Sequence, residues 1–319
     1  IQIAKKTSKD DLVIFLISGG ASALLCSPLD GINFVEKQKI NNELLKSGAS
    51  IDEMNIVRQS ISAVKGGRLL ELIKPSNCIT YGISDIPGDD PSFIGSGPTI
   101  YSNNDPNKLF EILDNYQIEI SKEILSIIKT NLLPKGINEN FHLIASPMKA
   151  LKAASNLAKK IGFLPIILSD KLEGDASKEG ERMANLALKI KKEKHYKNIS
   201  LEKPILLLSG GETTVKVNGL GKGGRNSEFA LSMVNTLKGN KNILGLSIDT
   251  DGIDGSEDNA GAFFSYETFL KSKKLNLDIK KYINNNDAFS FFEKTKDLIY
   301  TGPTLTNVND FRAVLVLPN

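Results

Sequence analysis

The chain has 319 residues, of which 40% are hydrophobic and 24% are charged, and its formal net charge is +3. Its length leaves room for two domains, and its composition is that of an ordinary soluble globular protein. It has no apolar run long enough to cross a bilayer and no basic run interleaved with aromatic residues, which excludes a membrane-spanning protein and a nucleic-acid-binding protein. Two cysteines, Cys26 and Cys78, are too few for a disulfide framework or a structural zinc site, so we expect a cytoplasmic protein.

The first strand is predicted at residues 11–17, a continuous apolar run typical of a parallel strand covered on both faces. The chain begins at Ile1, close to this strand, so we expect it to be a fragment. The strand ends in Ser18-Gly19-Gly20 and a short helix start. A strand, a glycine turn and a helix start form an arrangement that binds anions.

Two helices are predicted next. The first spans residues 33–47 and ends before Gly48, a plausible C-cap. The second opens at the capping-box pattern Ser50 to Glu53, carries Arg58, and ends at Lys65-Gly66-Gly67-Arg68.

An acidic loop follows the strand predicted at residues 78–83. It carries Asp85, Asp89 and Asp90 at the carboxyl end of the strand, where open α/β sheets place their sites. A rigid turn at residues 95–99 and amphipathic helices over residues 105–133 complete the first half.

The second half restarts near residue 138 with a strand at residues 141–145, a helix at 148–160 and a strand at 165–168. This order indicates one strand-helix-strand unit and a domain boundary between residues 137 and 138. A further helix is predicted at residues 175–192.

Residues 204–233 form the most distinctive stretch of the chain. A strand at residues 205–208 ends in Ser209-Gly210-Gly211, and a second strand-like run covers residues 213–217. Four glycines at positions 219, 221, 223 and 224 follow, with Lys222 and Arg225 among them, before a helix at residues 228–234. This pattern predicts a second anion site; the alternative is a long hairpin whose glycines serve turns.

Gly219, Gly221 and Gly224 also match the dinucleotide fingerprint, which makes a reductase the rival interpretation. The fingerprint requires an acidic residue about 20 residues further on. That position is near Leu244, inside an apolar strand, which counts against a reductase.

The strand predicted at residues 243–248 runs into Asp249, Asp251 and Asp254. Three carboxylates this close repel one another unless a cation lies between them, so the loop indicates a divalent metal or metal–phosphate role. An ordinary acidic turn is the alternative. A last strand is predicted at residues 313–317.

The two halves repeat three features in the same order: a strand ending in Ser-Gly-Gly, a strand ending in an acidic loop, and a Gly-Pro-Thr turn. This repetition predicts two α/β domains with mostly parallel, Rossmann-like sheets that face an interdomain cleft. Of the 40 basic residues only five are arginine, and Arg58, Arg68, Arg225 and Arg312 lie in stretches that look like site loops. Gly-rich loops, carboxylates and arginines suit phosphoryl transfer.

The segments that carry these motifs resemble the class II glycerate 2-kinases, whose members end in a MOFRL domain and were long named hydroxypyruvate reductases. The matching segments are LISGGASALL, NIVRQSISAVKGGRL, ISDIPGDDPSFIGSGPT, LSGGETTVKVNGLGKGGRNSEF, DTDGIDGSEDNAGA and TGPTLTNVNDFRAVL. The resemblance implies an N-terminal kinase domain at residues 1–137 and a C-terminal domain at 138–319 that contains the MOFRL region at about 204–319. It implies ATP- and Mg²⁺-dependent phosphorylation of D-glycerate at its 2-hydroxyl, with a homodimer as a further option.

The resemblance also implies roles for residues. Arg225 matches the catalytic arginine, and Asp89 is our choice for the general base; Asp249, Asp251 and Asp85 are the metal candidates. The candidates for binding substrate or phosphate are Ser18, Gly19, Gly20, Ser22, Arg58, Lys65, Ser96, Ser209, Gly210, Gly211, Glu212, Thr213, Lys222, Gly224, Asn226 and Asn309, with Arg58 and Lys65 for the glycerate carboxylate.

The family has a further N-terminal segment with a catalytic lysine in a Gly-Lys-Ala turn, and Lys5 and Lys6 do not lie in that context. We therefore expect either a fragment of a longer gene product or an impaired enzyme. An NAD(P)H-dependent hydroxypyruvate reductase and a non-catalytic phosphometabolite-binding fragment are the alternatives.

Overall fold

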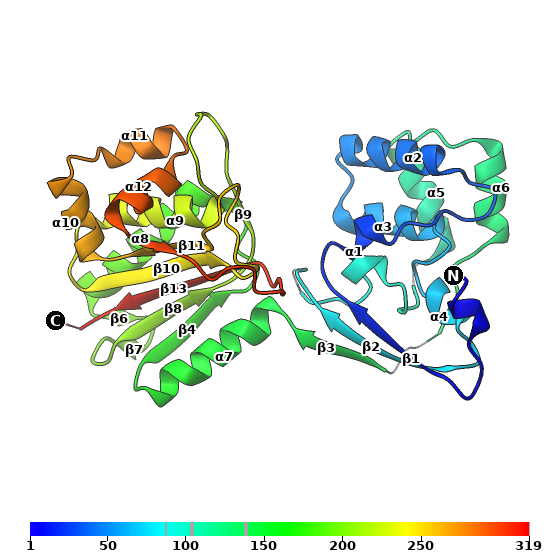
Figure 1. Cartoon of the computed structure of the whole chain (residues 1–319), viewed down its shortest axis with the longest axis horizontal. Helices are drawn as coiled ribbons and strands as arrows, with labels where there is room; N and C mark the ends of the chain where they lie inside the picture. Colours follow the sequence, from blue (N-terminus) through cyan, green and yellow to red (C-terminus); the bar gives the residue numbers. More distant parts are fainter. Residues whose placement is uncertain (87, 103–104, 137–139, 319) are drawn as a thin grey trace. The chain divides into compact units, whose positions relative to one another are not determined.

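The computed structural model describes residues 1–86, 88–102, 105–136 and 140–318. Pro87 of the predicted acidic loop and the predicted domain boundary at 137/138 lie outside the described residues. The chain divides into two compact units, Ile1–Ile144 and Ala145–Asn319 (Figure 1). Among the described residues, none of the helices combines the length and the apolarity that a bilayer crossing needs.

The first unit contains a three-stranded sheet in the order β1-β2-β3. β1 and β2 pair in parallel from Leu12 opposite Asn77 to Ile17 opposite Gly82. Its elements are η1 (Ala4–Lys6), β1 (Leu12–Ile17), α1 (Ala21–Leu24), α2 (Phe34–Ser47), α3 (Ile51–Ser60), α4 (Arg68–Leu72), β2 (Asn77–Ile83), η2 (Ile94–Ser96), α5 (Pro106–Asn115), α6 (Lys122–Thr130) and β3 (Phe141–Ala145).

The helix boundaries of this unit follow their capping residues. The predicted capping box of α3 is confirmed, because the Ser50 side chain accepts a hydrogen bond from the backbone of Glu53 and the Glu53 side chain accepts one from the backbone of Ser50. Gly48 ends α2 with φ 78°, a left-handed conformation that costs glycine little. Helices α2, α3, α5 and α6 share a hydrophobic cluster that includes Leu44, Val57 and Ile112.

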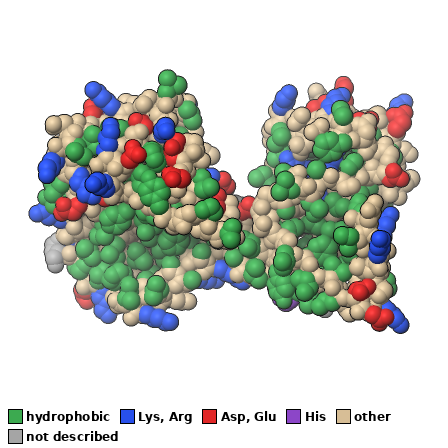
Figure 2. Space-filling view, viewed as in Figure 1, with side chains coloured by type: hydrophobic (Ala, Val, Ile, Leu, Met, Phe, Trp, Pro, Cys, Tyr) green, Lys and Arg blue, Asp and Glu red, His purple; other side chains and the backbone are tan. Residues whose placement is uncertain are grey.

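The prediction that the first strand is covered on both faces is wrong. Val13 and Phe15 pack against the core, whereas Leu12, Ile14 and Leu16 are 56%, 55% and 79% exposed. The core of this unit lies on one side of β1 only. Figure 2 shows hydrophobic side chains gathered over the strands of this unit.

The second unit contains a six-stranded sheet in the order β12-β11-β10-β13-β8-β4. Its elements are α7 (Pro147–Lys160), β4 (Leu164–Ser169), β5 (Gly174–Asp175), α8 (Ala176–Glu193), β6 (His195–Tyr196), β7 (Ile199–Ser200), β8 (Ile205–Ser209), β9 (Thr213–Thr214), α9 (Arg225–Leu237), β10 (Ile243–Asp249), β11 (Gly261–Phe264), α10 (Tyr266–Lys274), α11 (Ile279–Asn284), α12 (Ala288–Thr295), β12 (Leu298–Ile299) and β13 (Asp310–Val316). Helices α8 and α9 pack on each other and on the sheet around a core that includes Leu207, Phe229 and Val314.

The predicted α/β class with two domains is confirmed, but the pairing in the larger sheet is mixed rather than mostly parallel. β4 and β8 pair in parallel. β13 pairs antiparallel with both β8 and β10, and β10, β11 and β12 pair antiparallel in turn. β8 and β10 therefore run in the same direction with the last strand of the chain inserted between them, which the strand-helix-strand pattern of β8, α9 and β10 does not predict.

Two further expectations differ from the structure. β3 and β4 belong to different sheets, so the predicted unit of residues 141–168 is not one sheet motif. A strand-helix-strand order in the sequence does not say which sheet each strand joins. The strand expected at residues 213–217 is only β9, which pairs with β5 in a separate two-stranded sheet.

Candidate active site

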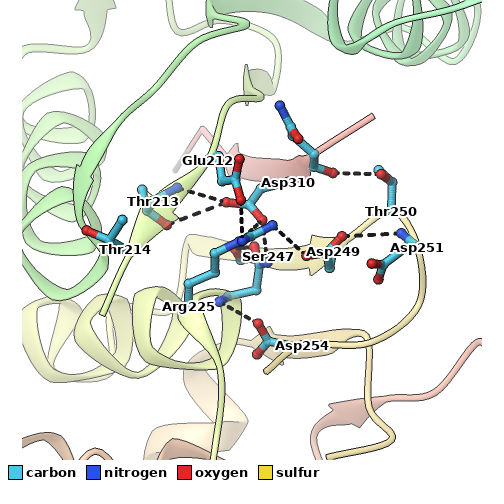
Figure 3. Close-up of polar contacts among 12 residues, drawn as sticks. Glu212, Thr213, Thr214, Arg225, Ser247, Asp249, Thr250, Asp251, Asp254 and Asp310 are labelled. Carbon is cyan, nitrogen blue, oxygen red and sulfur yellow. Dashed lines mark hydrogen bonds and ion pairs between the residues drawn. The ribbon is translucent and has the colours of Figure 1, made fainter. Parts of the chain in front are cut away.

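Arg225, the first residue of α9, is at the centre of a cluster of carboxylates in the second unit (Figure 3). Its Nε donates to Asp310 Oδ1, its Nη1 to Glu212 Oε1 and its Nη2 to Asp249 Oδ2, each at 2.7 Å. Arg225 and Asp249 line a cavity of about 660 Å³ together with Asp251 and the glycines of the preceding loop. The planar guanidinium is thus held in a fixed orientation at the wall of a cavity.

The inserted strand β13 positions two of the three carboxylates that hold Arg225, those of Asp310 and Asp249. Asp310 begins β13 and pairs in register with Asp249, the last residue of β10. Arg312 is fully buried, donates to Asp310 and to Thr213 Oγ1, and lies 4.9 Å from the Phe229 ring centroid. Arg312 therefore has a structural role, because its side chain compensates the buried Asp310.

Burial and charge act against each other at this site. Burial alone would lower the pKa of Arg225, but Asp310, Asp249 and Glu212 together raise it above its ordinary value. Burial raises the pKa of Asp249 to about 7, with Asp310 and Asp251 adding to the increase and Arg225 opposing it. Arg225 therefore remains protonated beside these carboxylates.

The N-terminus of α9 is already occupied by a carboxylate of the protein. Asp254, which is fully buried, accepts from the backbone N–H groups of Asn226 and Ser227 and from the Ser227 hydroxyl. A Cβ at Gly224 would lie 2.3 Å from the backbone of Asp254. The anion predicted at this helix start is therefore supplied by the protein itself, as the carboxylate of Asp254.

The other fingerprint glycines also serve contacts within the protein. A Cβ at Gly219 or at Gly221 would come within 2.5 Å of the backbone of Asn285. These glycines are therefore explained by the close approach of the loop backbone to the segment at Asn285. They do not support a pyrophosphate site.

Several of the predicted ligands in the second unit make structural contacts. Lys222 lies 3.5 Å from Glu257. Asn226 is fully buried, donates to Asp310 and accepts from Ser247. The backbone carbonyl of Asn309 accepts from both the N–H and the hydroxyl of Thr250.

The Ser209-Gly210-Gly211 turn is packed closely. The hydroxyl of Ser209 is buried and has no hydrogen-bond partner in the part of the chain that the structure describes. Gly210 exchanges backbone hydrogen bonds with Ser169 and Leu172, and a Cβ at Gly211 would lie 2.1 Å from the backbone of Leu172. The backbone N–H of Thr213 donates to Asp310, which brings this turn to the Arg225 cluster.

Among the described residues, no three His, Cys, Asp or Glu side chains are grouped so as to hold a metal ion. Asp249 and Asp251 line the cavity beside Arg225, and the backbone N–H of Asp251 donates to Asp249. Mg²⁺ is commonly bound by one or two carboxylates together with substrate phosphates. The donor set at Asp249 and Asp251 fits such a shared site. The third predicted ligand, Asp85, lies in the first unit.

The first unit brings its two predicted loops together. The Ser18-Gly19-Gly20 turn follows β1, the acidic loop follows the neighbouring β2, and a Cβ at Gly19 would lie 1.8 Å from the carboxylate of Asp85. Asp89 is half-buried in the same acidic loop with φ 58°.

A second cavity, of about 450 Å³, lies in the first unit and is lined by Gly20, Ser22, Arg58 and Lys65 among others. Lys65 Nζ donates to the carbonyl and the hydroxyl of Ser22 at 2.8 Å and to the hydroxyl of Ser96 at 3.3 Å. Burial, with Lys37 and Arg58 nearby, lowers the pKa of Lys65 to about 8. Arg68, by contrast, donates to backbone carbonyls of Gln59, Ser62 and Asn131 and is structural.

Sequence reasoning missed two residues of these sites. Asp310 contacts Arg225 directly, but it lies before the strand predicted at residues 313–317, and its place at the start of β13 is seen only in the structure. Lys37 lines the cavity of the first unit with its Nζ buried. The signal for it was its spacing of three and seven residues from Ile40 and Leu44, which places it on the buried face of α2, whereas Lys39 on the same helix is exposed.

Comparisons with known proteins match most of the chain. Residues 1–129 match the family model "Domain of unknown function (DUF4147)", and residues 205–310 match the MOFRL family. The chain is 42% identical over 312 residues to an Agrobacterium vitis protein provisionally named hydroxypyruvate reductase, covering 96% of this chain and 80% of that protein. It is 38% identical over 317 residues to the D-glycerate 2-kinase of Thermotoga maritima, covering 99% of this chain and 75% of that enzyme. A crystal structure of glycerate kinase from Thermotoga maritima has a TM-score of 0.90 and 37% identity, over 99% of this chain and 75% of that one.

Proposed function

The chain belongs to the glycerate 2-kinase family, and from this membership we propose that it transfers the terminal phosphoryl group of ATP to the 2-hydroxyl of D-glycerate. The products are 2-phosphoglycerate and ADP. The observation that supports this function most directly is the orientation of Arg225 beside two cavity carboxylates, those of Glu212 and Asp249.

Arg225 is proposed to stabilise the phosphoryl group during transfer. Its Nε bond to the buried Asp310 keeps the guanidinium oriented, while Nη1 and Nη2 exchange Glu212 and Asp249 for phosphoryl oxygens. Glu212 is 54% exposed, so its ion pair with Arg225 contributes little and is readily given up. Phosphoryl transfer depends mainly on such positioning and charge compensation.

Asp249 and Asp251 are proposed to hold Mg²⁺ together with the phosphates of ATP. When bound, Mg²⁺ neutralises charge on the phosphate oxygens. Asp89 is proposed as the base that accepts the proton of the 2-hydroxyl. Asp89 lies in the loop after β2, and Asp85 of the same loop approaches the Gly19 turn; this place supports the role.

The test is an incubation of the purified protein with ATP, Mg²⁺ and D-glycerate, with products identified by ³¹P NMR. We expect 2-phosphoglycerate and ADP in equal amounts, and no transfer after chelation with EDTA. Formation of only the 3-phospho isomer, or no ADP release, would contradict the proposal. Hydroxypyruvate with NADH tests the reductase alternative, and we expect no NADH oxidation, because the fingerprint glycines pack against the protein's own backbone.

A further inference from the structure

The cavity of the first unit is strongly cationic. Lys37, Arg58 and Lys65 all line it, and none of its lining residues is an aspartate or a glutamate. Its volume of about 450 Å³ suits a small ligand rather than a macromolecule. Three cations facing one enclosed space repel one another unless an anion lies between them.

Lys37 carries the main evidence for such an anion. Its side chain comes from α2 and is only 8% exposed, and its Nζ has no hydrogen-bond partner in the part of the chain that the structure describes. A buried ammonium group without a partner is unfavourable, because burial removes its hydration and nothing replaces it. A ligand anion would supply the partner that no group in the described part of the chain provides.

The other two cations are anchored around the same space. Arg58 Nε donates to Asn41 Oδ1 at 2.8 Å, and Lys65 is held by Ser22 and Ser96. These bonds fix the two side chains before a ligand arrives, which reduces the entropy lost on binding. The cavity is thus a built site with two anchored cations and one unpaired cation.

We propose that Lys37 is a third anion ligand, with Arg58 and Lys65, in a cavity that binds the three-carbon acid and prefers its phosphorylated form. This inference rests on the proposed function. Glycerate carries one negative charge, whereas 2-phosphoglycerate carries a carboxylate and a phosphate of about −1.5 to −2. A cavity lined by three cations and no carboxylate therefore favours 2-phosphoglycerate, with its additional phosphate charge, over glycerate. The same charge disfavours Mg²⁺, so the metal-bound nucleotide belongs to the cavity at Arg225, which has carboxylates.

Cys26 provides a direct probe of occupancy, because it is exposed and lines this cavity, whereas Cys78 is buried. Alkylation of Cys26 by neutral iodoacetamide is followed by peptide mass spectrometry, without ATP or Mg²⁺, at increasing D-glycerate or 2-phosphoglycerate. We expect both to slow alkylation, with half-protection at a concentration at least about tenfold lower for 2-phosphoglycerate, the equivalent of about 1.4 kcal/mol.

The Lys37→Met variant removes the charge and keeps the length of the side chain. We expect it to raise the half-protecting concentration of 2-phosphoglycerate at least about tenfold and to raise that of glycerate less. Lys37→Arg should restore protection. Lys39→Met is the matched control, because Lys39 lies on the same helix with its side chain 63% exposed, and it should change nothing. For each variant, the alkylation rate with ligand is divided by the rate without ligand, because replacing Lys37 also changes the charge near Cys26.

Unchanged protection in Lys37→Met, equal protection by the two acids, or no protection by either would overturn the inference. If protection depends on Lys37 but no phosphoryl transfer is detected, the proposed anion site stands and the proposed kinase function is wrong. Phosphoryl transfer without protection would retain the kinase and reject the site.

Discussion

Replacing Arg225 by lysine keeps the positive charge at the start of α9 and removes the planar fork. In the structure the three guanidinium nitrogens donate to three different carboxylates, those of Asp310, Glu212 and Asp249, at 2.7 Å each. A single ammonium group cannot reproduce these three directions. The substitution therefore tests the geometry of the site rather than its charge.

The structure also sets the size of the two expected effects. Breaking a fully buried ion pair costs about 3–5 kcal/mol, but Arg225 is 24% exposed and the charge is retained, so we expect a loss of about 1–2 kcal/mol in the free energy of unfolding. An arginine that stabilises a transferring phosphoryl group contributes about 10³–10⁵ to kcat. With the charge retained, we expect kcat to fall by at least about 100-fold.

The assay follows ADP release at saturating D-glycerate, alongside urea unfolding of the same preparation. Arg182→Lys is the control, because Arg182 is 77% exposed and forms an exposed ion pair with Glu179 on the same helix. It should leave kcat and stability unchanged. A folded Arg225→Lys protein whose kcat lies within about threefold of the parent would refute the role assigned to the fork.

Two further predictions concern stability. Asp254→Asn places an amide opposite two backbone N–H groups and should lower the free energy of unfolding, measured in urea, by about 2–4 kcal/mol. Asp175 accepts from the backbone N–H of Lys178 in α8, so Asp175→Asn should lower it by about 1 kcal/mol or less. Equal losses in the two variants would contradict this account. The pKa of Lys65 is lowered from 10.5 to about 8, so its charged form is disfavoured in the folded state. The free energy of unfolding should therefore rise by on the order of 3 kcal/mol between about pH 8 and 10.5, and a rise of the same size in Lys65→Met would exclude Lys65 as the cause.

Local structure was largely predictable because capping signals are encoded by neighbouring residues. Ser50 and Glu53 fixed the start of α3, and Gly48 fixed the end of α2. The pairing of β13 was not predictable in this way, because nothing local to residues 310–316 says which strands they join. That pairing places Asp310 against Asp249, so the carboxylate most important for orienting Arg225 was missed.

The functional residues show the same limit. The scarcity of arginine drew attention to Arg225 and Arg58, which line the two cavities, but Arg68 and Arg312 bind backbone carbonyls or a buried aspartate within the fold. A helix start after a glycine loop predicts an anion without saying whether the protein supplies it, and here Asp254 does. The helical spacing of Lys37 with Ile40 and Leu44 predicts that it faces the core, but it does not say that the ammonium group stays buried beside a cavity.

The close approach of Gly19 to Asp85 constrains how these sequences can diverge. Any side chain at position 19 would place its Cβ within 1.8 Å of the Asp85 carboxylate. The atoms in the way belong to the Asp85 side chain, so alanine at position 19 requires either another rotamer of Asp85 or a smaller residue at position 85. An orthologue with alanine at position 19 should therefore carry a smaller residue at position 85, or an Asp85 carboxylate turned away from the glycine turn.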